Sequence, residues 1–366
     1  MRVPAALRDD RLFAVLAIIA IPSLAHLWLS RAGYAPADDG MILALARRLM
    51  SGEVPHRDFI SVRPVGSGLV HAPWLLAGGL GYWMSRWFVW CQFGVIAWAC
   101  VRLLESYTQP LGGRRLPFAV LAFIATAHYM PPMAWHTIDG VCATCLGAAL
   151  VRTRAGWPRL VGYGLIGFSC ICKQSFVVSA PVAVLALGGH RAWRSVAAAL
   201  APGALYLAVL GLAGGLADAV QQLTRTSGPL LAGMSEMYLG LNSLVGIVLG
   251  LGVLAIDRWA PRAGRWARVL VLAPLFVGLV VRVLAWPRPL AFPMYCFTLV
   301  AYLAVTLIAQ RGEPRRLVAI ALALGVAASL SHGYLTPAIA SGLLLIGVAL
   351  PRPDRPDLLP GAALLG

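Results

Sequence analysis

The chain has 366 residues, of which 60% are hydrophobic and 12% charged, and its mean hydropathy is +0.78. Soluble domains carry about 25% charged residues, so this composition excludes an ordinary soluble protein and predicts an all-α, polytopic integral membrane protein. The net charge of +16 does not indicate a nucleic-acid partner, because the arginines stand in short clusters between apolar runs.

Apolar runs of spanning length predict about 12 transmembrane helices, within a range of about 11 to 13. The first run has no small-residue cleavage site after it and is interpreted as a span rather than as a cleaved leader. The run 66–84 is interpreted as interfacial, because counting it as a span would invert the arginine asymmetry of every later loop. The expected spans are 12–30, 86–104, 117–131, 138–151, 160–176, 177–189, 196–213, 239–256, 269–285, 290–309, 317–334 and 337–350.

We expect residues 1–350 to form one transmembrane domain, with a first outer loop at 31–85 that carries interfacial helices. Residues 351–366 are expected to be a short cytoplasmic tail, and no soluble domain is found. The positive-inside rule places most arginines, and both termini, on the cytoplasmic side of the cell (inner) membrane. Half of the 14 acids and six of the seven histidines then lie on the outer face, where we expect any chemistry to occur.

The first outer loop is dense in charge and begins with a helical pattern. Its apolar positions recur at spacings of three and four, Arg47 and Arg48 lie off that face, and Gly52 follows as a natural stop. This pattern predicts an amphipathic helix over 41–50 at the membrane surface, followed by a Pro-rich strap. The apolar positions are Met41, Ile42, Leu45 and Leu49.

Two carboxylates, Asp38 and Asp39, stand at the head of this helix. One interpretation is structural, because aspartate caps helices and suits the positive end of the helix dipole. The other is that one carboxylate caps while its neighbour faces a cavity, since adjacent helical residues point about 100° apart.

Asp139 opens the fourth expected span beside His136. It is either a solvated interfacial acid or a functional carboxylate, and its crowded polar neighbours favour function. Lys173 is the one lysine among 30 basic residues and ends an apolar run. It either snorkels to the interface or presents a compact charge to a phosphate, and we favour the phosphate.

Further cations and histidines lie in the strap, namely His56, Arg57 and Arg63. An ion pair between Arg57 and the neighbouring Asp58 is the simplest structural explanation for the first arginine. The histidines lack the short spacing that metal ligands on one helix show, so we assign no metal site.

Three segments together resemble the multi-spanning, lipid-dependent glycosyltransferases of the GT-C type, in particular the protein-mannosyltransferase and aminoarabinose-transferase branch. ADDGMILALARRLMSGEVPHRDFISVRPVGSG is similar to their first outer loop, through Asp38-Asp39, Gly52, Pro55–Phe59 and Pro64–Gly66. MAWHTIDG resembles their second acidic position, and GFSCICKQSF resembles their Gly-rich span that closes on lysine.

The resemblance implies an inverting glycosyltransferase that moves a sugar from a polyprenyl-phosphate carrier to a glycan, lipid or protein acceptor on the outer face. It implies Asp38 as base, with Asp39 and Asp139 orienting the base or the acceptor. Lys173, helped by Arg57 or Arg63, would hold the phosphate, and His56 and His136 are further candidates for substrate binding. No cofactor beyond the lipid-linked donor is required, and a divalent metal is the less favoured option.

Two departures from the family concern the strap and the acceptor. Val65 stands where a second proline is usual, and many relatives continue into a sizeable outer C-terminal domain that is not found after the twelfth expected span. The alternatives to a transferase are a transporter or flippase of a lipid-linked sugar and a non-catalytic binder of the carrier. A transporter would place ionisable groups near the midplane of two similar halves, whereas these acids gather toward one face.

Overall fold

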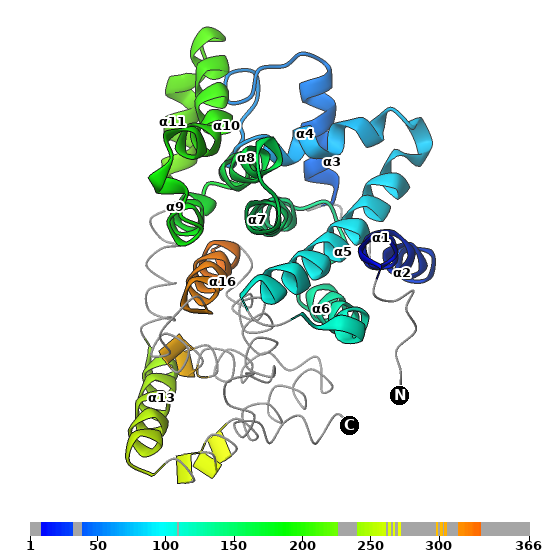
Figure 1. Cartoon of the computed structure of the whole chain (residues 1–366). Helices are drawn as coiled ribbons and strands as arrows, with labels where there is room; N and C mark the ends of the chain where they lie inside the picture. The colour runs from blue at the N-terminus through cyan, green and yellow to red at the C-terminus, as the bar shows by residue number, and fades with distance from the viewer. Residues whose placement is uncertain are drawn as a thin grey trace. The chain divides into compact units, whose positions relative to one another are not determined.

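The computed structural model of the chain describes residues 9–31, 39–107, 110–225, 240–260 and 314–330, with single positions between 263 and 305. Over these residues the regular secondary structure is helical throughout, which confirms the expected all-α class (Figure 1). The chain packs as two compact units, Met1–Ser106 with Pro110–Gly228 and Tyr107–Gln109 with Pro229–Gly366.

In the described part of the chain, four helices are long and apolar enough to cross a membrane. They are Asp10–Leu29, built from α1 (Asp10–Val15), a π-helical turn (Leu16–Ala20) and α2 (Ile21–Leu29); Gly78–Tyr107, which contains α5 (Gly81–Tyr107); α10 (Trp193–Leu212); and α13 (Leu241–Trp259). Large apolar side chains such as Trp28 and Leu212 stay 85% and 91% exposed. Apolar helices with such surfaces belong in lipid, so the protein is membrane-associated.

The remaining expected spans coincide with shorter helices. These are α6 (Arg115–Tyr129), α7 (His136–Thr153), α8 (Trp157–Cys172), α9 (Phe176–Ala186) and α16 (Pro314–Ser329). Three expected spans, 269–285, 290–309 and 337–350, lie wholly or mostly outside the described residues. A total of about 12 spans therefore stays a prediction.

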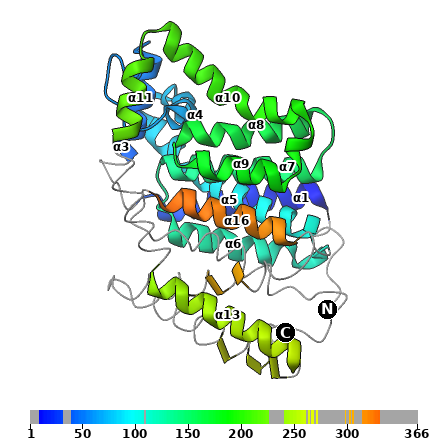
Figure 2. The same cartoon turned by 90° about the vertical axis from the view of Figure 1, so that its left-hand side faces the viewer.

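At the centre of the first unit lies α7, whose residues are almost all buried from His136 to Val151. It packs along α8, which also contacts α9 and α10, and Figure 2 shows α7, α8 and α9 side by side. A Cβ atom added at Gly147 would lie 2.5 Å from the Gly162 carbonyl oxygen, and one at Gly162 would lie 2.7 Å from that of Gly147. Small residues therefore allow α7 and α8 to approach closely, as they do between membrane helices.

The segment between α2 and α4 (Gly66–Leu75) contains the helix that the pattern predicts. It is α3 (Asp39–Met50), which buries Ile42, Leu45 and Ala46 and leaves Arg47 and Arg48 exposed. The helix ends at Gly52 with a φ of 81°, where the Gly52 N–H bonds to Leu49 and the Glu53 N–H to Arg48. This pair of bonds is a Schellman motif, so Gly52 is the expected stop.

The run 66–84 is not one helix. It divides into α4 (Gly66–Leu75), a 3-10 turn (Gly78–Leu80) and the start of α5. Ten helical residues extend about 15 Å, half the thickness of the hydrocarbon core, so α4 is too short to span. It packs instead on α3, α7 and α8.

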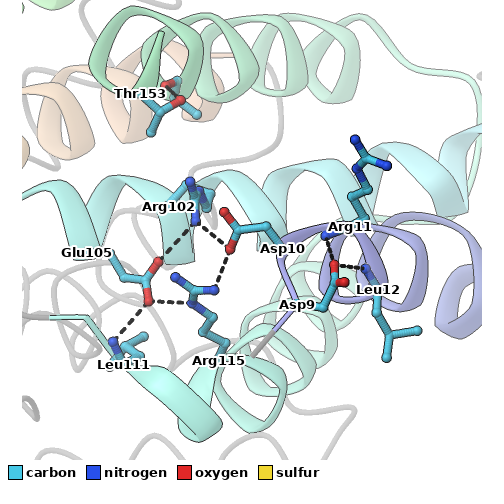
Figure 3. Close-up of polar contacts among 10 residues, drawn as sticks. Asp9, Asp10, Arg11, Leu12, Arg102, Glu105, Leu111, Arg115 and Thr153 are labelled. Carbon is cyan, nitrogen blue, oxygen red and sulfur yellow. Dashed lines mark hydrogen bonds and ion pairs between the residues drawn. The ribbon is translucent and has the colours of Figure 1, made fainter. Parts of the chain in front are cut away.

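A charged cluster joins the start of α1, the end of α5 and the start of α6 (Figure 3). Arg102 and Arg115 both contact Asp10, and Glu105 accepts hydrogen bonds from Arg115 Nε at 2.7 Å and from the Leu111 N–H at 2.9 Å. These ion pairs join three helix ends that lie far apart in the sequence.

The second unit contains α13 and α16, each described by its own residues. A Cβ atom added at Gly246 would lie 2.2 Å from the Thr298 carbonyl oxygen, and the Thr298 hydroxyl donates to the Asn242 carbonyl at 3.0 Å. A glycine on α13 therefore allows close contact with Thr298.

Candidate functional site

Asp39 lies in the first turn of α3 and is only 1% exposed. Its Oδ1 accepts a hydrogen bond from the Ala134 N–H at 3.3 Å, and its Oδ2 lies 4.0 Å from Nη2 of Arg86 on α5. Arg86 also donates to the carbonyls of Ser30 at 2.7 Å and Pro132 at 3.1 Å. This ion pair therefore ties the loop helix α3 to the end of α2, to α5 and to the segment before α7.

Asp139 lies in the first turn of α7 and is 2% exposed. Its Oδ1 accepts from Gln92 Nε2 at 2.7 Å and lies 3.3 Å from His71 Nε2. Its Oδ2 is buried and has no hydrogen-bond partner among the described residues. The carboxylate is therefore held at one oxygen, and the other oxygen is left available to a ligand.

Lys173 ends α8 and is 1% exposed. Its Nζ donates to Thr137 Oγ1 at 3.2 Å and lies 6.0 Å from the ring centroid of Phe176. Snorkelling would leave the ammonium at the lipid interface. Here it points instead into the first turn of α7, two residues before Asp139.

Arg63 and His136 lie in the same cluster as Lys173. His136 opens α7, and its Nδ1 donates to the Cys172 carbonyl at 3.0 Å. Arg63 is near enough to act electrostatically on both His136 and Lys173, and Asp139 also acts on His136. Five of the candidate site residues therefore gather around the start of α7: Asp39, Arg63, His136, Asp139 and Lys173.

The strap that carries Arg63 is fixed over the end of α8. Gln174 donates through Nε2 to the Val62 carbonyl at 3.0 Å. A Cβ atom added at Gly66 would lie 2.6 Å from the carbonyl carbon and oxygen of Ile171 and 2.7 Å from the nitrogen of Cys172. Glycine at this position therefore lets the start of α4 touch the backbone of α8.

His56 and Arg57 point to another part of the first unit. The buried His56 ring donates from Nδ1 to Gln222 Oε1 at 3.0 Å and accepts at Nε2 from Tyr206 Oη–H at 2.7 Å. Its backbone has a φ of 69°. These contacts join the strap to α10 and to α11 (Leu216–Arg225), and not to the cluster around Lys173.

Arg57 is exposed, pairs with Asp58 at 2.8 Å and donates to the Ala213 carbonyl at 2.8 Å. The hydrogen bond from Arg57, with that from the Val54 N–H, lowers the pKa of the Asp58 carboxyl to about 2. Burial lowers the pKa of His56 below its usual range, so this ring is neutral at pH 7. The strap is therefore held by fixed charges and by a neutral histidine.

Sequence reasoning did not identify several residues of the cluster. The positions of His71 and Ser85 follow no recognisable spacing in the sequence. Arg86 and Gln92 are polar residues in an apolar run, and this pattern could have identified them. Nor did it predict α11, although Leu216, Ala219, Val220 and Leu223 have helical spacing. Asp38 lies outside the described residues.

The fold and the cluster define an all-α, membrane-associated protein with buried acids and cations gathered around the start of α7. Over the described residues, no three His, Cys, Asp or Glu side chains are grouped to hold a metal ion. Compared with protein-family models, curated proteins and solved structures, the chain matches none.

Proposed function

We propose that the protein is an inverting glycosyltransferase that moves a sugar from a polyprenyl-phosphate carrier to a glycan, lipid or protein acceptor at the outer face of the membrane. The observation that carries the proposal is the meeting of Lys173, Arg63 and Asp139 at the start of α7. A lipid phosphate needs cations beside an apolar surface, and a sugar needs hydrogen-bonding groups next to that phosphate.

The cations suit the leaving group. In inverting transfer the acceptor oxygen attacks the anomeric carbon, a carboxylate takes the acceptor's proton, and the bond from the sugar to the phosphate oxygen breaks. The phosphate leaves with that electron pair, and Lys173 and Arg63 would stabilise its charge. No protonation of the leaving group is then required.

The carboxylates divide the remaining tasks. The resemblance assigns the base to Asp38. Asp39 would support it indirectly, because its ion pair with Arg86 fixes the start of α3. Asp139, with one free oxygen, would contact the substrate itself.

A transporter is less well supported. Transporters place ionisable groups at interrupted helices near the midplane. The cluster instead occupies helix ends, namely the first turns of α3 and α7 and the residue that directly follows α8. A non-catalytic binder would use the same phosphate contacts, and only a transfer assay separates it from an enzyme.

The test is transfer in proteoliposomes that contain the full chain. Labelled polyprenyl-phosphate hexoses and pentoses serve as donors, and membrane glycans and lipids of the source cells serve as acceptors. We expect transfer from at least one donor, reduced by roughly 100-fold or more in Asp38→Asn, because asparagine also suits a helix start but is no base. An Asn variant as active as the wild type would remove Asp38 as base, and binding without any transfer would leave only a lipid-phosphate binder.

A further inference from the structure

Three buried side chains from three helices form a hydrogen-bonded chain that ends on Asp139. Ser85 Oγ on α5 lies 2.8 Å from His71 Nδ1, and His71 Nε2 on α4 lies 3.3 Å from Asp139 Oδ1 on α7. His71 is fully buried, and Ser85 is 1% exposed. The contacts of Lys173 do not involve His71 or Ser85. The proposed function gives neither of these two residues a task.

The carboxylate decides how the histidine is protonated. An ionised Asp139 only accepts hydrogen bonds, so His71 Nε2 carries the proton and donates it. His71 Nδ1 then accepts from the Ser85 hydroxyl, which fixes the tautomer and the plane of the ring. Gln92 donates to the same Oδ1 atom at 2.7 Å.

The result is a carboxylate with two unequal oxygens. Oδ1 accepts two hydrogen bonds, whereas Oδ2 is buried and has no hydrogen-bond partner among the described residues. The Ser67 hydroxyl lies near the Asp139 carboxylate, but neither this hydroxyl nor Oδ2 forms a hydrogen bond of normal geometry among the described residues. A buried polar atom without a partner is costly, so this oxygen calls for a donor from a ligand.

The neighbouring charges restrict that ligand to a neutral donor. Lys173 and Arg63 lie in the same cluster and disfavour a further cation, and the carboxylate itself repels an anion. A hydroxyl group donates to a carboxylate oxygen through a short, strong bond without adding charge. Sugar hydroxyls have this chemistry.

We propose that His71, Ser85 and Gln92 position Asp139 so that its Oδ2 accepts a hydroxyl of the sugar, next to a phosphate held at Lys173. This sugar subsite rests on the proposed function, because it needs a lipid-linked sugar as ligand. Phe176 connects the two halves of the site. Its ring lies 6.0 Å from Lys173 Nζ, and a Cβ atom at Gly140, beside Asp139, would lie 2.3 Å from it.

Two substitutions of His71 separate positioning from simple packing. The amide nitrogen of His71→Gln reaches the place of Nε2 and keeps the bond to Asp139. That of His71→Asn reaches only the place of Nδ1 and loses the bond. Asp139→Asn keeps an acceptor for His71 and Gln92 but presents an NH₂ group where Oδ2 was, which reverses the polarity toward a hydroxyl.

The experiment compares the affinities of bare polyprenyl phosphate and of polyprenyl-phosphate hexose, pentose and hexosamine in nanodiscs. We expect the wild type to bind at least one glycosylated lipid more tightly than the bare phosphate, on the order of tenfold or more. Asp139→Asn and His71→Asn should lose this preference and keep the affinity for the bare lipid. His71→Gln should retain most of it.

Each failure has its own meaning. If bare and glycosylated lipids bind equally to the wild type, or if Asp139→Asn or His71→Asn keeps the preference, the sugar subsite is wrong. If His71→Gln and His71→Asn lose the preference for the glycosylated lipid equally, His71 is only a packing residue and its positioning role is overturned. If no lipid phosphate binds at all, the proposed function fails and the subsite fails with it.

Discussion

The ammonium of Lys173 and the hydroxyl of Thr137 lie 3.2 Å apart, so the single lysine of the chain, at the end of α8, points into the first turn of α7. A charge buried between two helix ends is costly unless it is compensated. Thr137 stands two residues before Asp139, so the ammonium contacts the same first turn of α7 that carries the carboxylate. That shared turn is the feature that the proposed function uses.

The contact between the strap and α8 can be tested at Gly66. A methyl group there would overlap the backbone of Ile171 and Cys172, which cannot rotate away as a side chain can. We expect Gly66→Ala to lower the free energy of unfolding by about 1–3 kcal/mol. Gly79→Ala is the matched control, because nothing lies within 4 Å of its added Cβ atom. Thermal unfolding in detergent measures both, and equal melting temperatures would contradict the close approach.

The ion pair between Asp39 and Arg86 predicts that substitutions of these two residues are coupled in their effects on the free energy of unfolding. Arg86→Met leaves a buried carboxylate without its cation and removes the hydrogen bonds to Ser30 and Pro132. We therefore expect it to lower the free energy of unfolding by about 3–5 kcal/mol. Asp39→Asn removes the opposite charge but keeps an acceptor for the Ala134 N–H. The double variant should be less destabilised than the sum by about 0.5–3 kcal/mol. Strict additivity in equilibrium unfolding would mean that the pair carries no coupling.

The charged cluster of Figure 3 contains one exposed and one enclosed acid. The side chain of Asp10 is 61% exposed, whereas that of Glu105 is 8% exposed and accepts from both Arg115 and Leu111. We expect Glu105→Gln to lower the free energy of unfolding by about 1–3 kcal/mol, and Asp10→Asn to lower it by no more than about 1 kcal/mol. Adding salt to about 1 M should abolish the effect of Asp10→Asn and preserve that of Glu105→Gln. The reverse order of the two losses would contradict this description.

His56 makes the stability of the strap depend on pH. Burial holds its folded-state pKa below the usual 6.5, so below about pH 6.5 the unfolded chain binds a proton at this residue before the folded protein does. Stability should therefore be fully present at pH 7 and fall as the pH decreases toward 5.

The matched variants for this pH test are His56→Asn and His190→Asn. Asparagine tolerates the positive φ of position 56 but does not titrate. We therefore expect the melting temperature of His56→Asn to fall less between pH 7 and pH 5 than that of the wild type. His190 is exposed and lies outside the strap, so its substitution should leave the wild-type drop unchanged. A drop in His56→Asn as large as that of the wild type would show that other groups cause the acid sensitivity.

The helices were predictable because their signals are local. Spacing and Gly52 gave the limits of α3 within two residues, and apolar runs located α5 to α10. The division of 66–84 into α4 and α5 was harder to predict. The break falls at the turn Gly78–Leu80, where Gly78 has a φ of 58°, and the apolar pattern continues across it.

The site was predictable only in part, for a related reason. Asp139 and Lys173 stood out because a charge in an apolar run is costly and needs a reason. His56 and Arg57 looked equivalent to Arg63 in sequence, yet His56 contacts Gln222 and Arg57 contacts Ala213, both on distant segments. Which member of a charged strap faces the core is decided by tertiary packing and leaves no local signal.

The most direct test of the central claim is the binding of polyprenyl phosphate to Lys173→Met in nanodiscs. Methionine fills a similar volume without charge, so the fold should persist, with a stability equal to or above that of the wild type. Arg154→Met is the matched control, since Arg154 is exposed and follows the last residue of α7, far along that helix from Thr137. We predict that Lys173→Met loses at least tenfold in affinity, about 1.4 kcal/mol, while Arg154→Met binds as the wild type does. Wild-type affinity in Lys173→Met, with the protein folded, would contradict the assignment of this end of α7 and α8 as the phosphate site.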